Sequence, residues 1–319
     1  MIYTLTLNPT LDYVMRIGQI RYDDINRVDS AEFFYGGKGI NVSAMVERLG
    51  FESRALGFVA GFTGAEFLRL VAKDGVRCDF TELPRGNTRV NVKIRTDFEL
   101  DLNADGPEVG EAEIDDLFSK LDRIENGDTL VLSGSAPKSL PQDFYETVLK
   151  RYANRDIRIC VDAEGELLLS VLKYRPFLVK PNHHELGRLF GVTAETDGEI
   201  DACAFRLREM GAKNVLVSGA EKGSRLYDEE GGVHSVPGIR GRLVNSIGCG
   251  DSLLAGFLAG RLRGYGFEEA QLLGAACGTA TAFTDGLGKI EEIERYFYEL
   301  KQTERLTEIE IQDRNTLRS

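Results

Sequence analysis

Short apolar runs alternate with amphipathic segments along most of the chain. The runs that predict strands are residues 2–7, 129–132, 157–161, 177–179 and 215–217. The amphipathic segments that predict helices are residues 39–49, 142–152, 164–173, 184–190 and 199–210. This alternation predicts an α/β fold with a doubly wound, mainly parallel sheet covered by helices on both faces. Ligands of such sheets bind beyond the carboxyl ends of the strands, so we expect a site in the loops that follow the strands.

Two regions have a different pattern. Residues 88–103 alternate strictly, with apolar side chains from Val90 to Ile94 on one face and polar side chains from Asn91 to Arg95 on the other. A period of two predicts a hairpin with one polar face, and residues 12–35 have a comparable polar, strand-like character. We therefore expect an α/β domain over residues 1–300, with a small β-sheet contributed by residues 12–35 and 88–103. Residues 301–319 are polar and charged, and predict a peripheral tail.

Composition narrows the class of protein. The 319 residues have a net charge of −12, which argues against nucleic acid or an acidic membrane as the partner. The five cysteines are widely spaced without a CxxC pair, so zinc-ribbon and thioredoxin-type sites are disfavoured and a reduced, cytoplasmic interior is expected. We find neither a signal-peptide pattern at the N-terminus nor an apolar stretch approaching 18 residues.

The segment Asn245-Ser246-Ile247-Gly248-Cys249-Gly250-Asp251 precedes an apolar helix rich in small residues. Backbone amides at a glycine-rich helix start add to the positive end of the helix dipole and form an anion site. A carboxylate at this start repels phosphate, but it is suited to accept a proton from an incoming hydroxyl. The alternative is that Asp251 is an ordinary helix N-terminal carboxylate and the glycines form a tight turn. Neither a Walker A loop nor a complete dinucleotide fingerprint occurs, which disfavours P-loop and dehydrogenase interpretations.

This segment resembles one signature of the ribokinase-like (PfkB) carbohydrate kinases, and residues 35–42 (Tyr-Gly-Gly-Lys-Gly-Ile-Asn-Val) resemble the other. Residues 5–12, 88–93 and 180–186 resemble the branch that contains 1-phosphofructokinases and tagatose-6-phosphate kinases. The resemblance extends over residues 1–300. It implies a ribokinase-like fold with a small β-sheet lid, and transfer of a phosphoryl group from ATP to a ketohexose phosphate. Fructose 1-phosphate is the favoured acceptor and tagatose 6-phosphate the rival. A non-catalytic sugar-phosphate-binding regulator is the alternative of another class, and the intact Asp251 argues against it.

The resemblance also implies roles for individual residues. Asp251 is the catalytic base, and the amides of Gly248, Cys249 and Gly250 hold the transferred phosphoryl group. The residues implied in substrate binding are Asp12, Gly37, Lys38, Asn41 and Arg89, with Arg27 and Lys93 as weaker candidates. Lys38 and Arg89 would bind the substrate's own phosphate, because a dianion in an acidic protein needs local cations. The residues implied in nucleotide binding are Lys180, Asn182, Ser218, Gly223 and Cys277. Glu185 is implied near Mg²⁺, through water, because Mg²⁺ keeps several waters.

Each role has a structural alternative. Asp12 could be an ordinary turn residue, and Asn41 and Glu185 could be ordinary residues of a helix start. Lys38 and Arg89 could be solvated surface charges. The small residues of the helix around Cys277 could serve close packing. His183 and His184 are adjacent, and neighbours on a helix do not share a face, so we expect no two-histidine metal site.

Two positions depart from the family pattern: Ala220 replaces a usual glycine in residues 218–223, and Cys249 replaces a usual alanine. A thiol at a helix N-terminus often has a lowered pKa, which suggests inactivation by thiol reagents; the alternative is a small buried residue. Exposed strands of the small sheet would allow a homodimer.

Overall fold

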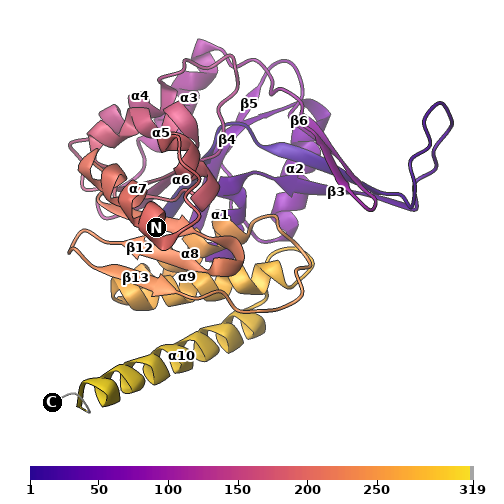
Figure 1. Ribbon diagram of the computed structural model, residues 1–319. Coiled ribbons are helices and arrows are strands. Elements are labelled where there is room, and N and C mark those ends of the chain that lie inside the picture. Colours follow the sequence, from indigo (N-terminus) through magenta and orange to yellow (C-terminus); the bar gives the residue numbers. More distant parts are fainter. Residues whose placement is uncertain (317–319) are drawn as a thin grey trace. The chain divides into compact units, whose positions relative to one another are not determined.

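The computed structural model describes the backbone of residues 1–316 and the side chains of residues 1–303. The chain forms two compact units, the first of residues 1–44 and 52–174, and the second of residues 45–51 and 175 onward. Helix α1 (Lys38–Arg48) is labelled in Figure 1. The boundary between the units falls inside it, between Ala44 and Met45. Each unit is described by itself.

The first unit contains five parallel strands in the order β9-β8-β1-β4-β5. The strands are β1 (Ile2–Thr6), β4 (Ser53–Ala60), β5 (Thr81–Leu83), β8 (Thr129–Ser133) and β9 (Arg158–Asp162). The helices are α2 (Gly61–Lys73), α3 (Glu111–Leu121), α4 (Phe144–Tyr152), α5 (Gly165–Val171) and the short 3₁₀ helix η1 (Leu172–Tyr174). Every residue of β1 and β8 is buried, as expected for strands covered on both faces.

A smaller sheet of four strands belongs to the same unit, in the order β3-β2-β6-β7. The strands are β2 (Thr10–Arg16), β3 (Ser30–Gly36), β6 (Arg89–Arg95) and β7 (Glu99–Leu102). β2 pairs antiparallel with β3 and parallel with β6, and β6 and β7 form the hairpin that the alternation predicts. Of the polar stretch 12–35, only the two ends are strands; residues 17–29 connect them.

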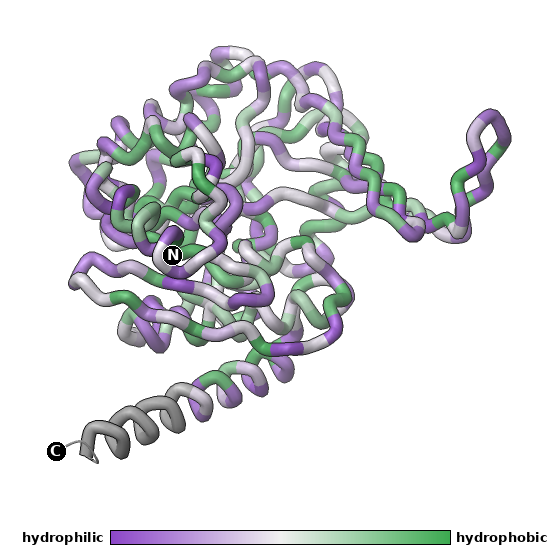
Figure 2. Tube along the Cα trace, viewed as in Figure 1, coloured by the Kyte–Doolittle hydropathy of each residue, from purple (hydrophilic) through white to green (hydrophobic). Residues whose placement is uncertain are grey.

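The two faces of this sheet have opposite character. Residues directly opposite on paired strands share a face, and the pairs of Tyr13 with Phe33 and Val92 make one face apolar. Asp12 lies opposite Asn91 on the other, polar face. Figure 2 shows the alternation of hydrophilic and hydrophobic residues along these strands. On β2 and β6 the polar face is buried around Asp12 and Asn91, which are each 6% exposed. On β3 both faces are exposed, because Phe33 on the apolar face is 46% exposed and Phe34, opposite Asp12, is 49% exposed.

The second unit contains four strands in the order β13-β12-β11-β10. β10 (Leu178–Val179) is parallel to β11 (Asn214–Ser218), and β12 (Ser224–Tyr227) and β13 (Val233–Val236) follow as antiparallel neighbours. The helices are α6 (His183–Phe190), α7 (Asp197–Glu209), the 3₁₀ helix η2 (Ala220–Lys222), α8 (Cys249–Leu262), α9 (Phe267–Ala282) and α10 (Ile290–Thr316). Mainly parallel strands with covering helices, plus a smaller sheet, confirm the predicted α/β class.

The predicted peripheral tail of residues 301–319 begins inside a helix. Helix α10 runs through that position without a break. The side chains after Thr303 and residues 317–319 lie outside the described residues. Within the described part of the chain, no helix is long and apolar enough to cross a membrane.

Helices α8 and α9 pack closely because glycines line their contact. A Cβ built on Gly256 of α8 would lie 2.7 Å from the Sγ of Cys277 and 2.7 Å from the Cα of Gly274, both on α9. Gly198 of α7 is the opposite case, because a Cβ there would have no heavy atom within 4 Å.

These two glycines give a matched test of the packing. We expect Gly256→Ala to destabilise the protein by about 1–3 kcal/mol, because the added methyl overpacks the α8–α9 contact. Gly198→Ala should leave stability unchanged or raise it by up to about 1 kcal/mol, because alanine is the better helix former. Urea unfolding followed by circular dichroism measures both variants, and equal stability of Gly256→Ala and the parent would contradict the close packing.

Candidate active site

The glycine turn that starts α1 lies directly against the strands of the first unit. A Cβ built on Gly36 would lie 2.6 Å from the Cγ2 of Thr10 and 2.9 Å from the Oδ2 of Asp12. Gly37 has a φ of 138°, which side-chain-bearing residues rarely adopt, and its Cβ would lie 2.9 Å from the Cγ2 of Thr6. Glycine at these positions therefore keeps the turn close to the Asp12 carboxylate.

Asp12 is held by three neighbours on the buried face of the small sheet. Its Oδ2 lies 2.7 Å from the Nζ of Lys93, and the two side chains are 8% and 9% exposed. Its Oδ1 accepts hydrogen bonds from Thr10 Oγ1 (3.0 Å) and Asn91 Nδ2 (3.2 Å). A buried carboxylate fixed in this way is not an exposed turn aspartate, and Lys93, predicted only as a weaker candidate, is its ionic partner.

Arg89 is a half-buried cation at the start of the same polar face. Its Nη2 donates to the backbone carbonyl of Asn8 at 3.0 Å, and its buried Nε has no hydrogen-bond partner in the structure. Burial lowers the pKa of Arg89 below its usual value, against the opposing effect of the charges of Asp12 and Asp105. The guanidinium thus has donor capacity that the protein's own groups do not use, which favours an anion-binding role over a solvated surface charge.

Lys38 is anchored by a carboxylate that the sequence did not single out. Its Nζ lies 3.0 Å from the Oδ1 of Asp162 and 4.0 Å from the Oε1 of Glu164. The Asp162 side chain is fully buried at the end of β9. The available signal was its position, directly after the apolar run 157–161, where parallel sheets place ligand-binding residues. Asn41 is half-buried in the first turn of α1, and its backbone N donates to Gly37 O at 3.1 Å.

In the second unit, Gly248 caps the N-terminus of α8 with a φ of 80° and without a side-chain cap. By helix geometry, the first amides of α8, those of Cys249 and Gly250, do not bond to a preceding turn of the helix. Asp251 is 7% exposed. The start of α8 therefore combines uncapped amides with a nearly buried carboxylate, as the glycine-rich segment predicts.

Lys180 adds a cation to this helix start. It follows β10 and is 5% exposed. A Cβ built on Gly250 would lie 3.1 Å from its Nζ, so glycine at position 250 leaves space for the ammonium group. An ammonium group beside helix N-terminal amides is suited to bind phosphate.

Residues 180–185 and the loop 218–223 lie side by side. Asn182 and Ser218 form a parallel bridge, and Ser218 N donates to Pro181 O at 3.2 Å. Asn182 and Glu185 also cap α6 reciprocally: Glu185 N donates to Asn182 Oδ1, and Asn182 N donates to Glu185 Oε2, both at 2.8 Å. This capping box accounts for the Asn182 side chain and for one oxygen of Glu185. It agrees with the structural alternative for Glu185 and leaves its role near Mg²⁺ a prediction.

The loop of residues 218–223 keeps a glycine-like backbone despite its departure from the family pattern. Ala220 has a φ of 52°, in the left-handed region, and Gly219 N donates to Gly223 O at 2.7 Å. A non-glycine residue in this region costs about 1–2 kcal/mol. The replacement therefore adds strain without abolishing the turn.

The structure favours the alternative for Cys249, a small and largely buried residue, over an activated thiol. Burial, with a smaller contribution from the Asp251 charge, raises the pKa of Cys249 to about 11. The thiol donates to the Asn245 carbonyl at 3.3 Å. Cys277 is fully buried against Gly256, so the structure favours packing for its side chain over contact with a nucleotide.

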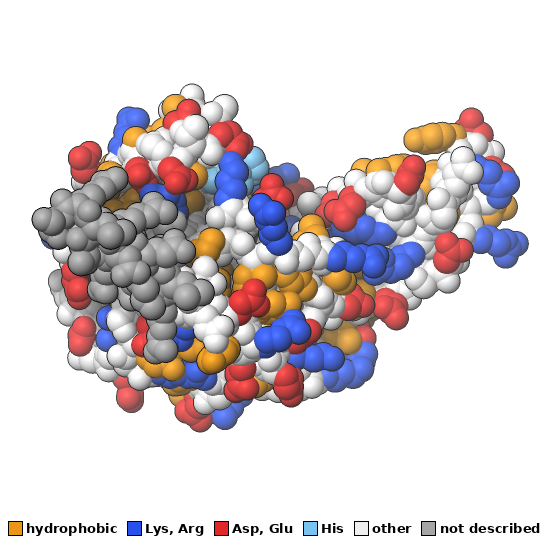
Figure 3. All heavy atoms as spheres, turned by 60° about the horizontal axis from the view of Figure 1, so that its bottom comes forward, with side chains coloured by type: hydrophobic (Ala, Val, Ile, Leu, Met, Phe, Trp, Pro, Cys, Tyr) orange, Lys and Arg blue, Asp and Glu red, His pale blue; other side chains and the backbone are white. Residues whose placement is uncertain are grey.

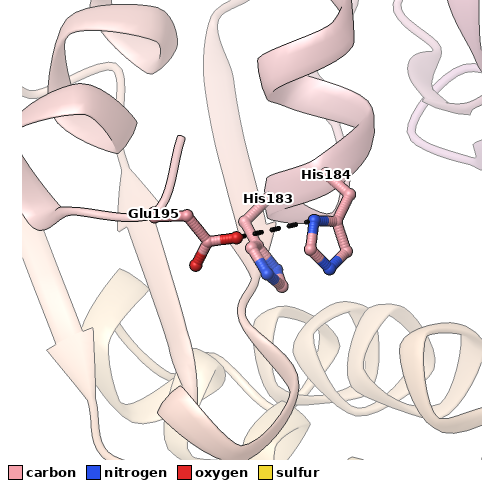
Figure 4. Close-up of side chains that lie close together, drawn as sticks. All are labelled: His183, His184 and Glu195. Carbon is pink, nitrogen blue, oxygen red and sulfur yellow. Dashed lines mark ion pairs between the residues drawn. The ribbon is translucent and has the colours of Figure 1, made fainter. Parts of the chain in front are cut away.

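The expectation that His183 and His184 do not share a face is wrong. Their ring centroids lie 3.8 Å apart, and His184 Nδ1 lies 3.9 Å from Glu195 Oε1 (Figure 4). Side chains of a helix tilt toward its N-terminus. In the first turn of α6 they extend past the helix end, where no earlier turn separates them. Burial and the neighbouring His184 lower the pKa of His183.

The chain belongs to the PfkB family, because the family model described as pfkB family carbohydrate kinase matches residues 5–293. A 1-phosphofructokinase of Bacillus subtilis (strain 168) is 40% identical over 303 residues, which are 95% of this chain and 99% of that protein. A D-tagatose-1-phosphate kinase of Bacillus licheniformis is 32% identical, over 92% of this chain and 97% of that protein. The crystal structure of phosphofructokinase-2 from Escherichia coli in complex with fructose-6-phosphate has a TM-score of 0.86 and 28% identity, and covers 94% of this chain and 99% of that chain. The predicted family is confirmed: the protein is a carbohydrate kinase, a phosphotransferase that uses ATP.

The raised pKa of Cys249 gives a chemical test. Below about pH 11 the thiol stays protonated, so at pH 8 it should react with iodoacetamide on the order of 100-fold more slowly than free cysteine. The rate should rise about tenfold per pH unit up to that pKa, because only the thiolate reacts. Mass spectrometry of the peptide that contains Cys249 measures the labelling. Rapid modification at pH 7 would show that the thiol is not held in this buried, protonated form.

Proposed function

We propose that this protein phosphorylates fructose 1-phosphate with ATP and produces fructose 1,6-bisphosphate, in the cytoplasm. The observation that carries the proposal is the start of α8, where nearly buried Asp251 stands in a turn of uncapped amides with the Lys180 ammonium beside Gly250. A carboxylate in such a place has an evident use when a hydroxyl must lose a proton next to a phosphoryl group. The 40% identity with the B. subtilis 1-phosphofructokinase supports the choice of acceptor.

In this mechanism Asp251 accepts the proton of the acceptor hydroxyl as that hydroxyl attacks the γ-phosphorus of ATP. The amides of Gly248, Cys249 and Gly250 would stabilise the charge on the transferred group, and the Lys180 ammonium would add to this stabilisation. The transition state of phosphoryl transfer needs positioning and charge stabilisation more than covalent chemistry, and these residues supply both. Asn182, Ser218 and Gly223 would bind the rest of the nucleotide.

The first unit would bind the sugar phosphate. Asp12 and Asn41 would orient hydroxyl groups, because a carboxylate and an amide accept and donate with defined direction. Arg89 and Lys38 would bind the phosphate already on the sugar, and Gly37 would allow the close approach of substrate to backbone. Asp12 and Asp162 hold Lys93 and Lys38 in place, so these cations pay less conformational entropy when a dianion binds.

Mg²⁺ suits the carboxylate oxygens of Glu185, because it prefers oxygen ligands. Glu185 is 8% exposed and follows Asn182, whose side chain already fixes the backbone there. A single carboxylate is consistent with an ion that keeps most of its waters and contacts the protein through one of them. When bound, the ion would neutralise phosphate charge. Glu185 would orient its water shell.

Tagatose 1-phosphate is a second candidate acceptor, because a D-tagatose-1-phosphate kinase is 32% identical to the chain. It has its phosphate on the same carbon as fructose 1-phosphate and differs from it in the configuration of one hydroxyl-bearing carbon. Tagatose 6-phosphate, the rival that the motifs suggest, has its phosphate at the opposite end. A site that binds the resident phosphate through Lys38 and Arg89 should discriminate more strongly between a 1-phosphate and a 6-phosphate than between fructose 1-phosphate and tagatose 1-phosphate.

The small sheet would act as a lid that excludes water during transfer, and a second copy of the chain would cover its apolar face. The strongest support is the exposure of that face: Phe33 is 46%, Leu100 39% and Leu102 53% exposed. Figure 3 shows hydrophobic side chains on the projecting strands at the right of the view. Exposed apolar strands pair or aggregate unless something covers them.

Release of ADP tests the catalytic proposal. We expect turnover with fructose 1-phosphate to exceed turnover with tagatose 1-phosphate, and both to exceed tagatose 6-phosphate. Asp251→Asn should lower kcat by about 10²–10⁴-fold, because the amide cannot accept the proton. Binding of the sugar phosphate should persist in this variant, since the substrate residues are elsewhere in the sequence.

The matched control is Asp285→Asn, which removes an exposed carboxylate of the same unit and should leave kcat unchanged. Parental turnover by Asp251→Asn would reject Asp251 as the base. Tight binding of sugar phosphate without turnover in the parent protein would instead favour the regulator.

Sedimentation velocity tests the dimer. We expect the parent to sediment as a dimer and Phe33→Glu as a monomer, because the variant places a charge on the apolar face, where Phe33 stacks on Tyr13 with centroids 4.5 Å apart. Tyr298→Glu changes an aromatic residue that is 66% exposed on α10 and serves as the control. A parent that stays monomeric at high concentration, or a Phe33→Glu variant that stays dimeric, would contradict the proposed interface.

A further inference from the structure

Three side chains of the second unit place metal-binding atoms close together. The ligand atoms of His183, His184 and Glu195 all lie within 4.8 Å of one another. Figure 4 shows both imidazoles extending from the first turn of α6 and the carboxylate of Glu195 directed toward them. Nothing in the proposed phosphoryl transfer uses these three groups.

The backbone on either side of the cluster is fixed. The first turn of α6 is held by the reciprocal cap between Asn182 and Glu185. Glu195 precedes α7, and its backbone N donates to Glu199 Oε2 at 3.0 Å, while its carbonyl accepts from Lys222 Nζ at 3.0 Å. The backbone that carries the three side chains is therefore already ordered before an ion binds.

His183 has the outer hydrogen bond that metal-binding histidines usually have. Its Nδ1 lies 3.4 Å from the backbone carbonyl of Ser218. A carbonyl only accepts, so this contact assigns the proton to Nδ1 and leaves the lone pair on Nε2. A histidine whose second nitrogen donates to a carbonyl is held in the tautomer and orientation that a metal ligand needs.

We propose that His183, His184 and Glu195 form a binding site for a divalent transition-metal ion of the zinc type. Two imidazoles and one carboxylate are a known ligand set for Zn²⁺, with a further position open to water. Mg²⁺ and Ca²⁺ prefer oxygen ligands, so the two imidazoles select against them. This site is separate from the Mg²⁺ role of Glu185, and its existence does not depend on the proposed substrate.

Only small side-chain rotations are required. Ligand atoms of a tetrahedral site with bonds of about 2.0–2.1 Å lie roughly 3.3 Å apart. His184 and Glu195 have side chains 61% and 50% exposed, so both are able to rotate toward the anchored ring of His183. The entropy cost is limited to these two side chains.

Lys222 competes with the ion for Glu195. Its Nζ lies 2.7 Å from the Glu195 Oε2. An ion that takes the carboxylate would displace this ammonium group, which belongs to the loop of residues 218–223. The competition weakens metal binding, and it makes Lys222 a position where a substitution should strengthen binding.

Titration calorimetry of the full-length, chelator-treated protein with Zn²⁺ alone, without nucleotide, tests the proposal. We expect one ion per chain, and no displacement by excess Mg²⁺. His184→Ala and Glu195→Gln should each weaken Zn²⁺ binding by about tenfold or more. Lys222→Gln should tighten it several-fold. Glu221→Gln, an exposed neighbour in the same loop, should leave it unchanged.

Two further measurements exclude other sites. Co²⁺ bound at this site should show visible ligand-field bands without the thiolate charge-transfer band that a cysteine ligand gives. His184→Ala should retain parental kinase turnover in excess Mg²⁺ with a chelator selective for Zn²⁺, which shows that the variant is folded. Zn²⁺ affinity unchanged by His184→Ala, a thiolate band with Co²⁺, or a Lys222→Gln variant no tighter than the parent would overturn the three-ligand site.

Discussion

The site of this kinase must hold highly charged phosphates in a protein whose own net charge is −12. The structure meets this constraint locally, by fixing cations with buried partners. Lys38 is anchored by fully buried Asp162, and Lys93 by Asp12. A cation anchored in this way is oriented before substrate arrives, at the cost of sharing its charge with the carboxylate. In the second unit Lys180 stands instead beside Gly250, where helix amides would help to bind the anion in the proposed mechanism.

The small sheet inverts the usual relation between polarity and burial. Its polar residues Asp12, Asn91 and Lys93 on β2 and β6 are buried, whereas the apolar Phe33 and Leu102 on the opposite face are exposed. Burial of hydrogen-bonding groups is costly unless they have partners, and the network around Asp12 supplies them. An inverted sheet of this kind is stable when substrate uses one face and an apolar partner covers the other. Both proposed roles of the sheet, lid and interface, follow from this one inversion.

Sequence predicted those features that local pattern determines. The apolar runs became β1, β8, β9, β10 and β11 within one or two residues at each end, and the alternation of residues 88–103 became a hairpin. The glycine-rich segment gave the uncapped start of α8, because glycine at a helix start leaves amides without a side-chain partner. These features depend on neighbours in the chain, which a single sequence displays.

Other features depend on contacts between distant segments and could not be predicted. The raised pKa of Cys249 follows from burial, whereas the local rule for a helix N-terminus gives the opposite sign. The partnership of Lys38 with Asp162 joins residues far apart in the sequence. The proximity of His183 and His184 was not predicted, because the rule that helix neighbours do not share a face applies to helix interiors. These two residues lie in the first turn.

The two helix starts of the second unit show how one position decides the chemistry of a site. At α8 the N-cap is Gly248, which has no side chain to cap the helix, so the amides of Cys249 and Gly250 could take the proposed role of binding a phosphate. At α6 the N-cap is Asn182, whose side chain bonds the Glu185 amide while Glu185 bonds back. Two donors that an anion would need are thereby used, and the first turn instead presents two imidazoles beside the Glu195 carboxylate. A glycine N-cap thus favours an anion site. An asparagine N-cap and its partner use two of the amides, so the helix start is less unfavourable for a bound cation.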